Sequence, residues 1–167
     1  GKAQEKFADY PFISYAQLDI EQPPSQQGFA PHQYDIIIAA NVLHATQDLP
    51  GTLSHIHELL ARGGQLILLE TTTPRRWIDL TFGLTEGWWR FADARQEQPL
   101  LTIRQWEELL QQNGFHALAL APDEAELIGQ GVIVARTADR KTGRQDDKMT
   151  PTTGRRRQGD KKTKIDS

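Results

Sequence analysis

Polar and ionisable side chains follow three predicted strands, at the points where the apolar runs stop. Asp19 and Ile20 end the first run, residues 41–44 follow the second, and residues 70–73 follow the third. In open α/β sheets, ligands bind outside the carboxyl ends of the strands. We therefore expect a carboxylate, an amide with a histidine, and a second carboxylate to face one crevice.

These side-chain types suit proton transfer beside a bound ligand. His44 can take up a proton near neutral pH. The carboxylate of Glu70 can hold one tautomer of that imidazole and stabilise its cation, as an aspartate does in catalytic triads. The carboxylate of Asp19 can accept hydrogen bonds from a ribose hydroxyl or an adenine amino group. The sequence thus predicts a catalytic pair, His44 and Glu70, beside three residues that can bind a ligand: Asp19, Ile20 and Asn41.

The periodicity of the apolar residues predicts alternating strands and helices. Strands are expected at residues 12–20, 34–40, 65–70, 116–122 and 131–137, and the run at 34–40 is typical of a parallel strand buried on both faces. Helices are expected at residues 2–10, 48–62, 75–91 and 102–112; Gly63-Gly64 would end the second, Thr102 would cap the last, and Asn113-Gly114 would end it. This alternation indicates an α/β fold with a mostly parallel sheet, and the short link before the last strand predicts that this strand is antiparallel.

The composition predicts one domain followed by a basic tail. The chain has 167 residues and a net charge of −3, divided into −8 for residues 1–136 (9 Lys+Arg, 17 Asp+Glu) and +5 for residues 137–167 (10 against 5). The tail has three apolar residues, so it cannot offset its ordering entropy, and we expect it to be disordered. The chain has no cysteine, no signal-peptide pattern and no bilayer-long apolar run, which suits the cytoplasm. We expect no membrane partner, and nucleic acid binding by the tail is the less favoured interpretation.

Several motifs together resemble one known family. In order, they are LDIE, QGF, YDIIIAANVLHATQDL, LLARGGQLILLETT, RWIDLTFGLTEGWWRFAD and PLLTIRQWEELLQQNGF, within residues 3–136. They resemble the C-methyltransferase domain of modular (type I) polyketide synthases. The resemblance implies a Rossmann-like class I methyltransferase fold. It also implies the use of S-adenosylmethionine to methylate the α-carbon of a β-ketoacyl chain on an acyl carrier protein. The catalytic histidine and glutamate of that family match His44 and Glu70.

One part of the family pattern is absent from the sequence. Class I methyltransferases hold the methionine end of the cofactor with a glycine-rich loop after their first strand, and no G-x-G-x-G cluster occurs here. The resemblance also begins after the first two strands of the family. We therefore expect residues 1–136 to be the C-terminal part of such a domain, working with the rest of a polyketide synthase.

Less specific interpretations stay open for several residues. Asp19 could simply form a turn, and Asn41 could simply end a strand. Trp88 and Trp89 could line an acyl tunnel or belong to the core, and Arg75 and Arg76 could meet a phosphopantetheine phosphate or stay solvated. No metal site is expected, because the histidines at 55 and 57 face different directions on one helix. The whole chain could also be a non-catalytic spacer or an O-methyltransferase.

Overall fold

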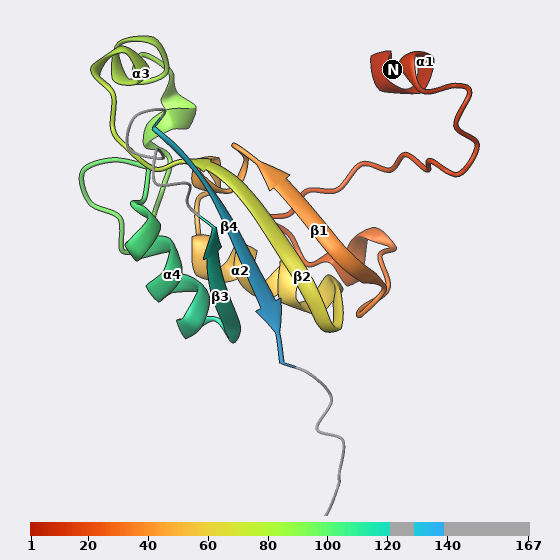
Figure 1. Ribbon diagram of the computed structural model, residues 1–167. Helices are drawn as coiled ribbons and strands as arrows, with labels where there is room; N and C mark the ends of the chain where they lie inside the picture. The colour runs from red at the N-terminus through yellow and green to blue at the C-terminus, as the bar shows by residue number, and fades with distance from the viewer. Residues whose placement is uncertain (121–128, 139–167) are drawn as a thin grey trace, which may run out of the picture.

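The computed structural model describes residues 1–120 and 129–138. Its centre is a four-stranded sheet of β1 (Tyr34–Ala40), β2 (Leu60–Thr71), β3 (Phe115–Leu120) and β4 (Gln130–Thr137), in the order β1-β2-β4-β3 (Figure 1). Predictions for residues 121–128 and 139–167, which include nearly all of the basic tail, lie outside the described residues. Thr137, which the composition assigns to the tail, is the buried last residue of β4, in agreement with the strand predicted at residues 131–137.

The strand directions make this a mixed sheet. β1 and β2 are parallel, whereas β4 is antiparallel to both of its neighbours, β2 and β3. The prediction of an antiparallel last strand is confirmed. The prediction of a mostly parallel sheet is confirmed only in part. β1, β2 and β3 run in the same direction, but β4 lies between β2 and β3 and runs the opposite way. One of the three strand pairs is therefore parallel and two are antiparallel.

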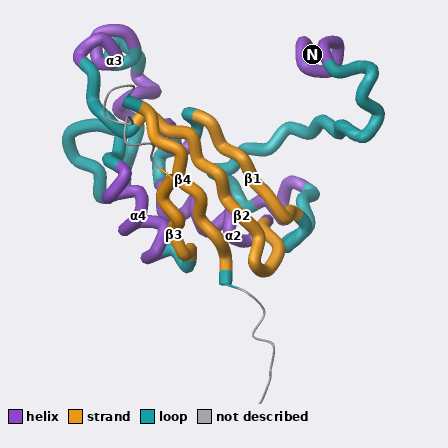
Figure 2. The backbone as a smooth tube through the Cα atoms, in the orientation of Figure 1, coloured by secondary structure: helices purple, strands orange, loops and turns teal. Residues whose placement is uncertain are grey.

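Two helices cover one face of the sheet. α2 (Leu49–Leu59) and α4 (Ile103–Gln112) lie side by side against it (Figure 2). Their buried residues pack against alternate residues of the strands, as the two-residue repeat of a strand requires. The core contains Leu49, Leu53, Ile56, Trp106 and Leu110 from the helices and Ala39, Leu66, Leu68, Phe115, Ile133 and Ala135 from the strands.

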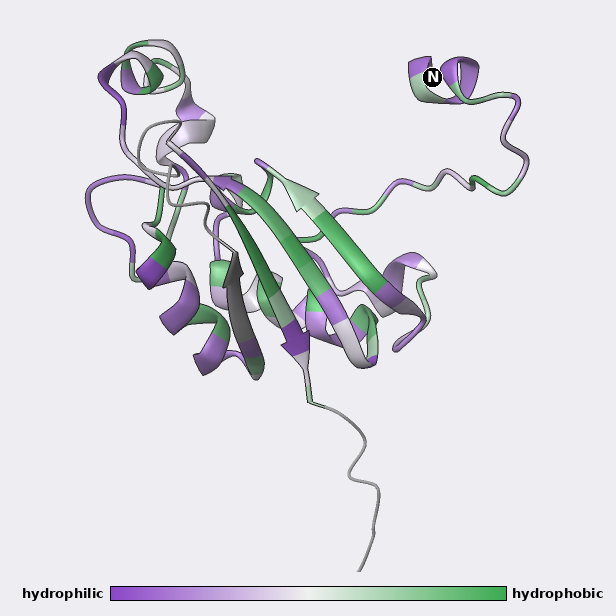
Figure 3. Ribbon diagram, viewed as in Figure 1, coloured by the Kyte–Doolittle hydropathy of each residue, from purple (hydrophilic) through white to green (hydrophobic). Residues whose placement is uncertain are grey.

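The opposite face of the sheet is apolar and has no helix among the described residues. Ile36 and Ile38 of β1 are 54% and 70% exposed. Four aliphatic residues of the neighbouring strands are partly buried on this face, namely Ile67, Leu69, Val132 and Val134. Figure 3 shows the apolar colour along β1, β2 and β4. The prediction that β1 is buried on both faces is therefore wrong for the described part of the chain.

The chain before β1 differs most from the sequence prediction. A short helix, α1 (Lys2–Lys6), has no buried residue, and no strand forms at residues 12–20. Phe12 is 80% exposed, and this segment runs away from the sheet as an arm (Figure 1). A strand needs a partner for its backbone groups, and no strand of the described chain pairs with this one. A 3₁₀ turn, η1 (Pro24–Gln27), precedes β1.

Gly63 and Gly64 lie within a strand and not at the end of a helix. α2 ends at Leu59, and Leu60 is already extended and pairs with Tyr34 of β1. The register between the two strands shifts between Tyr34 and Ile36. Gly63 has φ of +72°, and a Cβ on Gly64 would lie 2.8 Å from the Ala61 carbonyl oxygen. The glycine pair therefore accommodates an irregularity in β2.

The helical stretch expected at residues 75–91 is divided in two. α3 (Arg76–Thr81) and the 3₁₀ turn η3 (Glu86–Trp89) are separated by Gly83, where a Cβ would lie 2.3 Å from the Asp79 carbonyl oxygen. The predicted cap of α4 is confirmed, because Thr102 Oγ1 accepts a hydrogen bond from the backbone N–H of Gln105 at 3.3 Å. No helix in the part of the chain that the structure describes is both long and apolar enough to cross a bilayer.

Candidate active site

Parallel pairing brings the carboxyl ends of β1 and β2 together. Ala40 of β1 pairs with Leu69 of β2, so the residues that follow lie side by side. His44 is in a 3₁₀ turn, η2 (Leu43–Ala45), just after β1, and Glu70 is near the end of β2. His44 Nδ1 lies 2.6 Å from Glu70 Oε2. The structure thus places the predicted pair in direct contact.

Glu70 is buried and fully engaged by the loop that carries His44. Its side chain is 0% exposed. Its second oxygen, Oε1, accepts hydrogen bonds from the backbone N–H groups of Val42 and Leu43, at 3.2 and 3.0 Å. A buried carboxylate needs such donors, because burial without them carries a large desolvation cost. Glu70 therefore fixes both the backbone before His44 and the His44 ring.

This contact sets the tautomer of His44. A carboxylate only accepts hydrogen bonds, so the neutral imidazole must carry its proton on Nδ1. The lone pair is then on Nε2, which has no hydrogen-bond partner among residues 1–120 and 129–138. The His44 side chain is 12% exposed. Nε2 is therefore a basic nitrogen available to a ligand.

A cavity of about 550 Å³ lies beside His44. One wall is aromatic, because the His44 ring meets the edge of Trp88 at 5.8 Å between centroids and Trp88 stacks on Phe82 at 5.6 Å. The volume is within the usual range for small-molecule sites. The lining residues are Asn41, His44, Ala45, Thr71, Trp77, Ile78, Phe82, Thr85, Gly87, Trp88, Arg90, Leu100 and Gln130.

Asn41 ends β1 and also lies on the cavity wall. It has φ of +50°, a left-handed conformation that asparagine tolerates better than most residues. Its Oδ1 accepts hydrogen bonds from the backbone N–H and the hydroxyl of Thr71, at 3.1 and 3.2 Å. Asn41 therefore ends the strand and lies on the cavity wall, and its contact with a cofactor stays a prediction.

Asp19 and Ile20 do not line this cavity. Asp19 is exposed, and its Oδ1 accepts a hydrogen bond from the Glu21 N–H at 3.0 Å, so it forms a local turn. The carbonyl of Ile20 lies 2.8 Å from His55 Nδ1. Glu21, in turn, accepts a hydrogen bond from the Gln47 N–H at 2.5 Å, which connects this segment to the loop after His44.

The two tryptophans and the two arginines that the sequence singled out occupy different surroundings. Trp88 is 8% exposed and lines the cavity, whereas Trp89 is 48% exposed and donates to the Gly83 carbonyl. Arg76 is exposed, and Arg75 lies against Gly129. Of these two tryptophans, Trp88 is therefore the one placed to contact a ligand beside His44.

Asp93 and Arg95 form a buried ion pair that the sequence did not single out. Arg95 Nε lies 2.7 Å from Asp93 Oδ1, and each side chain is 6% exposed. Burial alone would raise the pKa of the Asp93 carboxyl. Hydrogen bonds from Arg95 and from the Leu49 N–H, together with the charge of Arg95, outweigh that effect and lower the pKa. The only signal in the sequence is a pair of opposite charges in a loop, which is equally typical of a solvated surface.

Comparison with known proteins decides the family. A family model described as a methyltransferase domain matches residues 3–120. The chain belongs to this methyltransferase family.

The relatives of this chain include polyketide synthases and carbon methyltransferases, which narrows the kind of methyltransferase domain it resembles. It is 39% identical, over 145 residues, to the polyketide synthase ThaQ of Burkholderia thailandensis. It is similar to the crystal structure of the CurJ carbon methyltransferase, with 54% identity and a TM-score of 0.77. It is also similar to the trans-methyltransferase CalH in complex with SAH, with 33% identity and a TM-score of 0.70. The resemblance to C-methyltransferase domains of polyketide synthases is thereby confirmed.

The chain spans only part of each of these proteins. The match covers 84% of this chain but 7% of ThaQ. The structural match covers 83% of this chain and 38% of the CurJ methyltransferase, and 81% of this chain and 39% of CalH.

Proposed function

We propose that this chain carries the catalytic pair of a carbon methyltransferase that acts within a polyketide synthase. Its substrate is the α-carbon of a β-ketoacyl chain on an acyl carrier protein. The observation that supports the proposal most strongly is the 2.6 Å contact between His44 and a fully buried Glu70, beside a cavity with an apolar wall. The identity to carbon methyltransferases supports the same chemistry.

His44 acts as the general base. The α-carbon between a ketone and a thioester is already acidified, so a histidine is a sufficient base. The α C–H bond breaks, the proton moves to Nε2 of His44, and the electron pair enters the enolate. Glu70 keeps the Nδ1–H in place and balances the charge of the imidazolium. S-adenosylmethionine, when bound, supplies the electrophilic methyl group that this carbon accepts.

For that cofactor, the described residues supply candidate contacts at one end only. Asn41 presents an amide group on the cavity wall beside His44. Asp19 and Ile20, which we propose contact the adenosine part, lie on the segment that Glu21 connects to the loop after His44. The sequence offers no glycine-rich turn for the methionine end. The remaining contacts must come from outside the described residues.

We propose further that residues 1–136 are the C-terminal part of a larger methyltransferase domain. β1 pairs on one side only among the described strands, and its isoleucines on the open face are exposed. Strands and helices of the same domain would cover this edge and this face, as in parallel sheets with helices on both sides.

Single-turnover methyl transfer tests this function in the polyketide synthase that contains the chain. With a β-ketoacyl carrier protein as substrate, we expect His44→Ala to abolish methylation while S-adenosylmethionine still binds. The matched control is His116→Ala, which removes an exposed histidine on β3 and should methylate at the parent rate.

Three outcomes would contradict the proposal. Methylation by His44→Ala at the parent rate would show that His44 is a loop histidine. A parent protein that binds the cofactor and the carrier protein but methylates no carbon would favour a non-catalytic spacer. Methylation of the enol oxygen would instead support an O-methyltransferase.

A further inference from the structure

We propose that Arg95, held by Asp93, is a positioning residue that fixes the catalytic orientation of His44. The inference rests on the proposed role of His44 as a base. Arg95 touches no atom of the cavity beside His44, and it acts through the backbone of the turn that carries this histidine. The Asp93–Arg95 clamp denotes these two side chains with their hydrogen bonds.

Arg95 donates a hydrogen bond to the His44 carbonyl, which the hydrogen bonds within the η2 turn do not use. Within the turn, the Ala45 N–H donates to the Val42 carbonyl and the Thr46 N–H donates to the Leu43 carbonyl. The next carbonyl, that of His44, is not used by these bonds. Arg95 Nη1 donates to it at 2.7 Å. A partly buried carbonyl is stabilised by such a partner.

The guanidinium uses all five of its N–H groups in this region. Besides the bonds to Asp93 and to the His44 carbonyl, it donates to three other backbone carbonyls. These belong to Thr46 at 2.6 Å, Gln47 at 3.4 Å and Pro99 at 3.4 Å. A planar group with five donors in a fixed arrangement holds its acceptors more tightly than an ammonium can. Residues 44–47 are therefore fastened to the segment 93–99.

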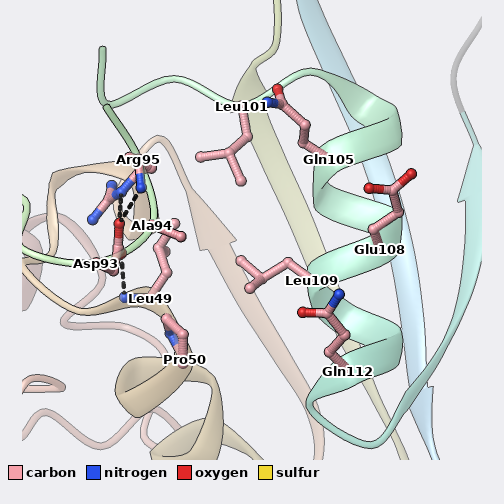
Figure 4. A pocket seen from close by; sticks show the side chains of 10 residues that line it. All are labelled: Leu49, Pro50, Asp93, Ala94, Arg95, Leu101, Gln105, Glu108, Leu109 and Gln112. Carbon is pink, nitrogen blue, oxygen red and sulfur yellow. Dashed lines mark hydrogen bonds and ion pairs between the residues drawn. The ribbon is translucent and has the colours of Figure 1, made fainter. Parts of the chain in front are cut away.

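Asp93 extends the clamp to the start of α2. Its Oδ2 accepts a hydrogen bond from the Leu49 N–H at 2.9 Å, and its Oδ1 accepts one from the Arg95 N–H at 3.0 Å. Figure 4 shows both side chains at the edge of a smaller cavity, with dashed lines between them and to the Leu49 nitrogen. The buried Asp93–Arg95 pair therefore holds both the start of α2 and the η2 turn that carries His44.

The η2 turn is thus fixed at both ends. At its beginning, Glu70 accepts the N–H groups of Val42 and Leu43. At its end, Arg95 donates to the carbonyls of His44 and Thr46. The position of the ring relative to Glu70 depends on both anchors. Without Arg95, the carbonyls of His44 and Thr46 lose their side-chain donor, and the 2.6 Å bond between His44 and Glu70 should loosen.

NMR of the His44 imidazole tests this inference without any catalytic activity. In the 167-residue chain, the ring signals are assigned by their loss in His44→Ala. We expect the parent to show the Nδ1–H tautomer with a proton that exchanges slowly with water. In Arg95→Gln the proton signal should broaden or disappear, and both tautomers should be populated. Arg95→Lys keeps the positive charge but has only three N–H donors. The Nδ1 proton of His44 should therefore exchange with water faster in this variant than in the parent.

Two controls separate positioning from a general loss of stability. Leu110→Ala removes a buried core side chain on α4 that makes no hydrogen bond, and Arg104→Gln removes an exposed arginine on the same helix. Both should keep the parent imidazole signals, even if Leu110→Ala lowers the unfolding temperature as much as Arg95→Gln does. Parent signals in Arg95→Gln would overturn the inference, and if that variant does not fold, parent exchange rates in Arg95→Lys would do so.

Kinetics supply a second, separate test in the intact synthase. Arg95→Lys should lower kcat at least tenfold, with the KM for the β-ketoacyl carrier protein within twofold of the parent value. A change confined to KM would overturn the positioning role. If the parent transfers no methyl group, the proposed function fails, but the NMR result still decides whether Arg95 orients His44.

Discussion

Replacing Glu70 with glutamine should destabilise the fold and deprive His44 of its base function. Glutamine has nearly the same shape, but one of its two oxygen acceptors becomes an NH₂ donor. Glu70 faces donors on both sides: the N–H groups of Val42 and Leu43 at one oxygen, and the Nδ1–H of His44 at the other. No orientation of the amide satisfies both sides.

Each orientation of the glutamine has a definite consequence. With its oxygen toward Val42 and Leu43, the NH₂ meets His44, which must move its proton to Nε2 and lose the lone pair that faces the cavity. With its oxygen toward His44, the buried N–H of Leu43 and the partly buried N–H of Val42 face a donor. A hydrogen bond to a charged group contributes about 1.5–3 kcal/mol, and a buried unsatisfied donor costs about 1–3 kcal/mol. We expect the free energy of unfolding to fall by about 3 kcal/mol, since these costs partly relax.

Urea unfolding of the parent chain, Glu70→Gln and the matched control Glu108→Gln measures this effect. Glu108 pairs with Arg104 on the exposed face of α4, so its substitution should change the free energy by less than about 0.5 kcal/mol. With an m-value of about 2 kcal/mol/M, the midpoint for Glu70→Gln should fall by about 1.5 M. A midpoint equal to that of the control would refute the argument that Glu70 holds three donors.

Three further predictions follow from the fold. Thr102→Ala should lower the free energy of unfolding by about 1 kcal/mol through loss of the α4 cap, and Thr102→Ser should restore most of it, as measured by urea unfolding. The folded-state pKa of Asp93 is depressed, so its stabilising contribution is present above the unfolded value of about 3.9 and is lost as the pH falls through the folded pKa. Asp93→Asn should therefore flatten the acid side of the stability–pH curve, and an unchanged slope would contradict this. Light scattering should show that the isolated chain associates as its concentration rises. The double variant Ile36→Lys, Ile38→Lys should associate less, because lysine blocks pairing at an exposed strand edge. A parent chain that stays monomeric at every concentration would contradict this prediction.

Local patterns predicted the elements that carry the site. The run at residues 34–40 is the β1 strand of the structure, and the contact between His44 and Glu70 follows from the parallel pairing of two adjacent strands. The cap and the end of α4 were also predictable, because Thr102 and the pair Asn113-Gly114 determine backbone geometry through local chemistry.

The errors occurred where tertiary contacts override a local pattern. Residues 12–20 have strand-forming side chains but no partner strand among the described residues. Gly63-Gly64 resembles a helix end, yet the backbone is already paired with β1 at Leu60. A glycine that approaches the Asp79 carbonyl separates α3 from η3.

The Asp93–Arg95 clamp could not be predicted because burial decides its role. Aspartate and arginine two residues apart in a polar loop are most often solvated. Here the loop folds over the turn that carries His44, and five backbone and side-chain acceptors surround one guanidinium. That arrangement depends on the distance in space between residues 44–47 and 93–99, which the sequence does not encode in any local pattern.

Hydrogen–deuterium exchange at the α-carbon tests the central claim most directly, because it isolates proton abstraction from methyl transfer. In the experiment, a polyketide synthase that contains the chain would be mixed in D₂O with a β-ketoacyl carrier protein and without S-adenosylmethionine. Deuterium in the acyl chain would be followed by mass spectrometry. We predict exchange well above the spontaneous rate for the parent and for His116→Ala, and only the spontaneous rate for His44→Ala and Glu70→Gln. Parent-rate exchange by His44→Ala would show that another group removes the proton.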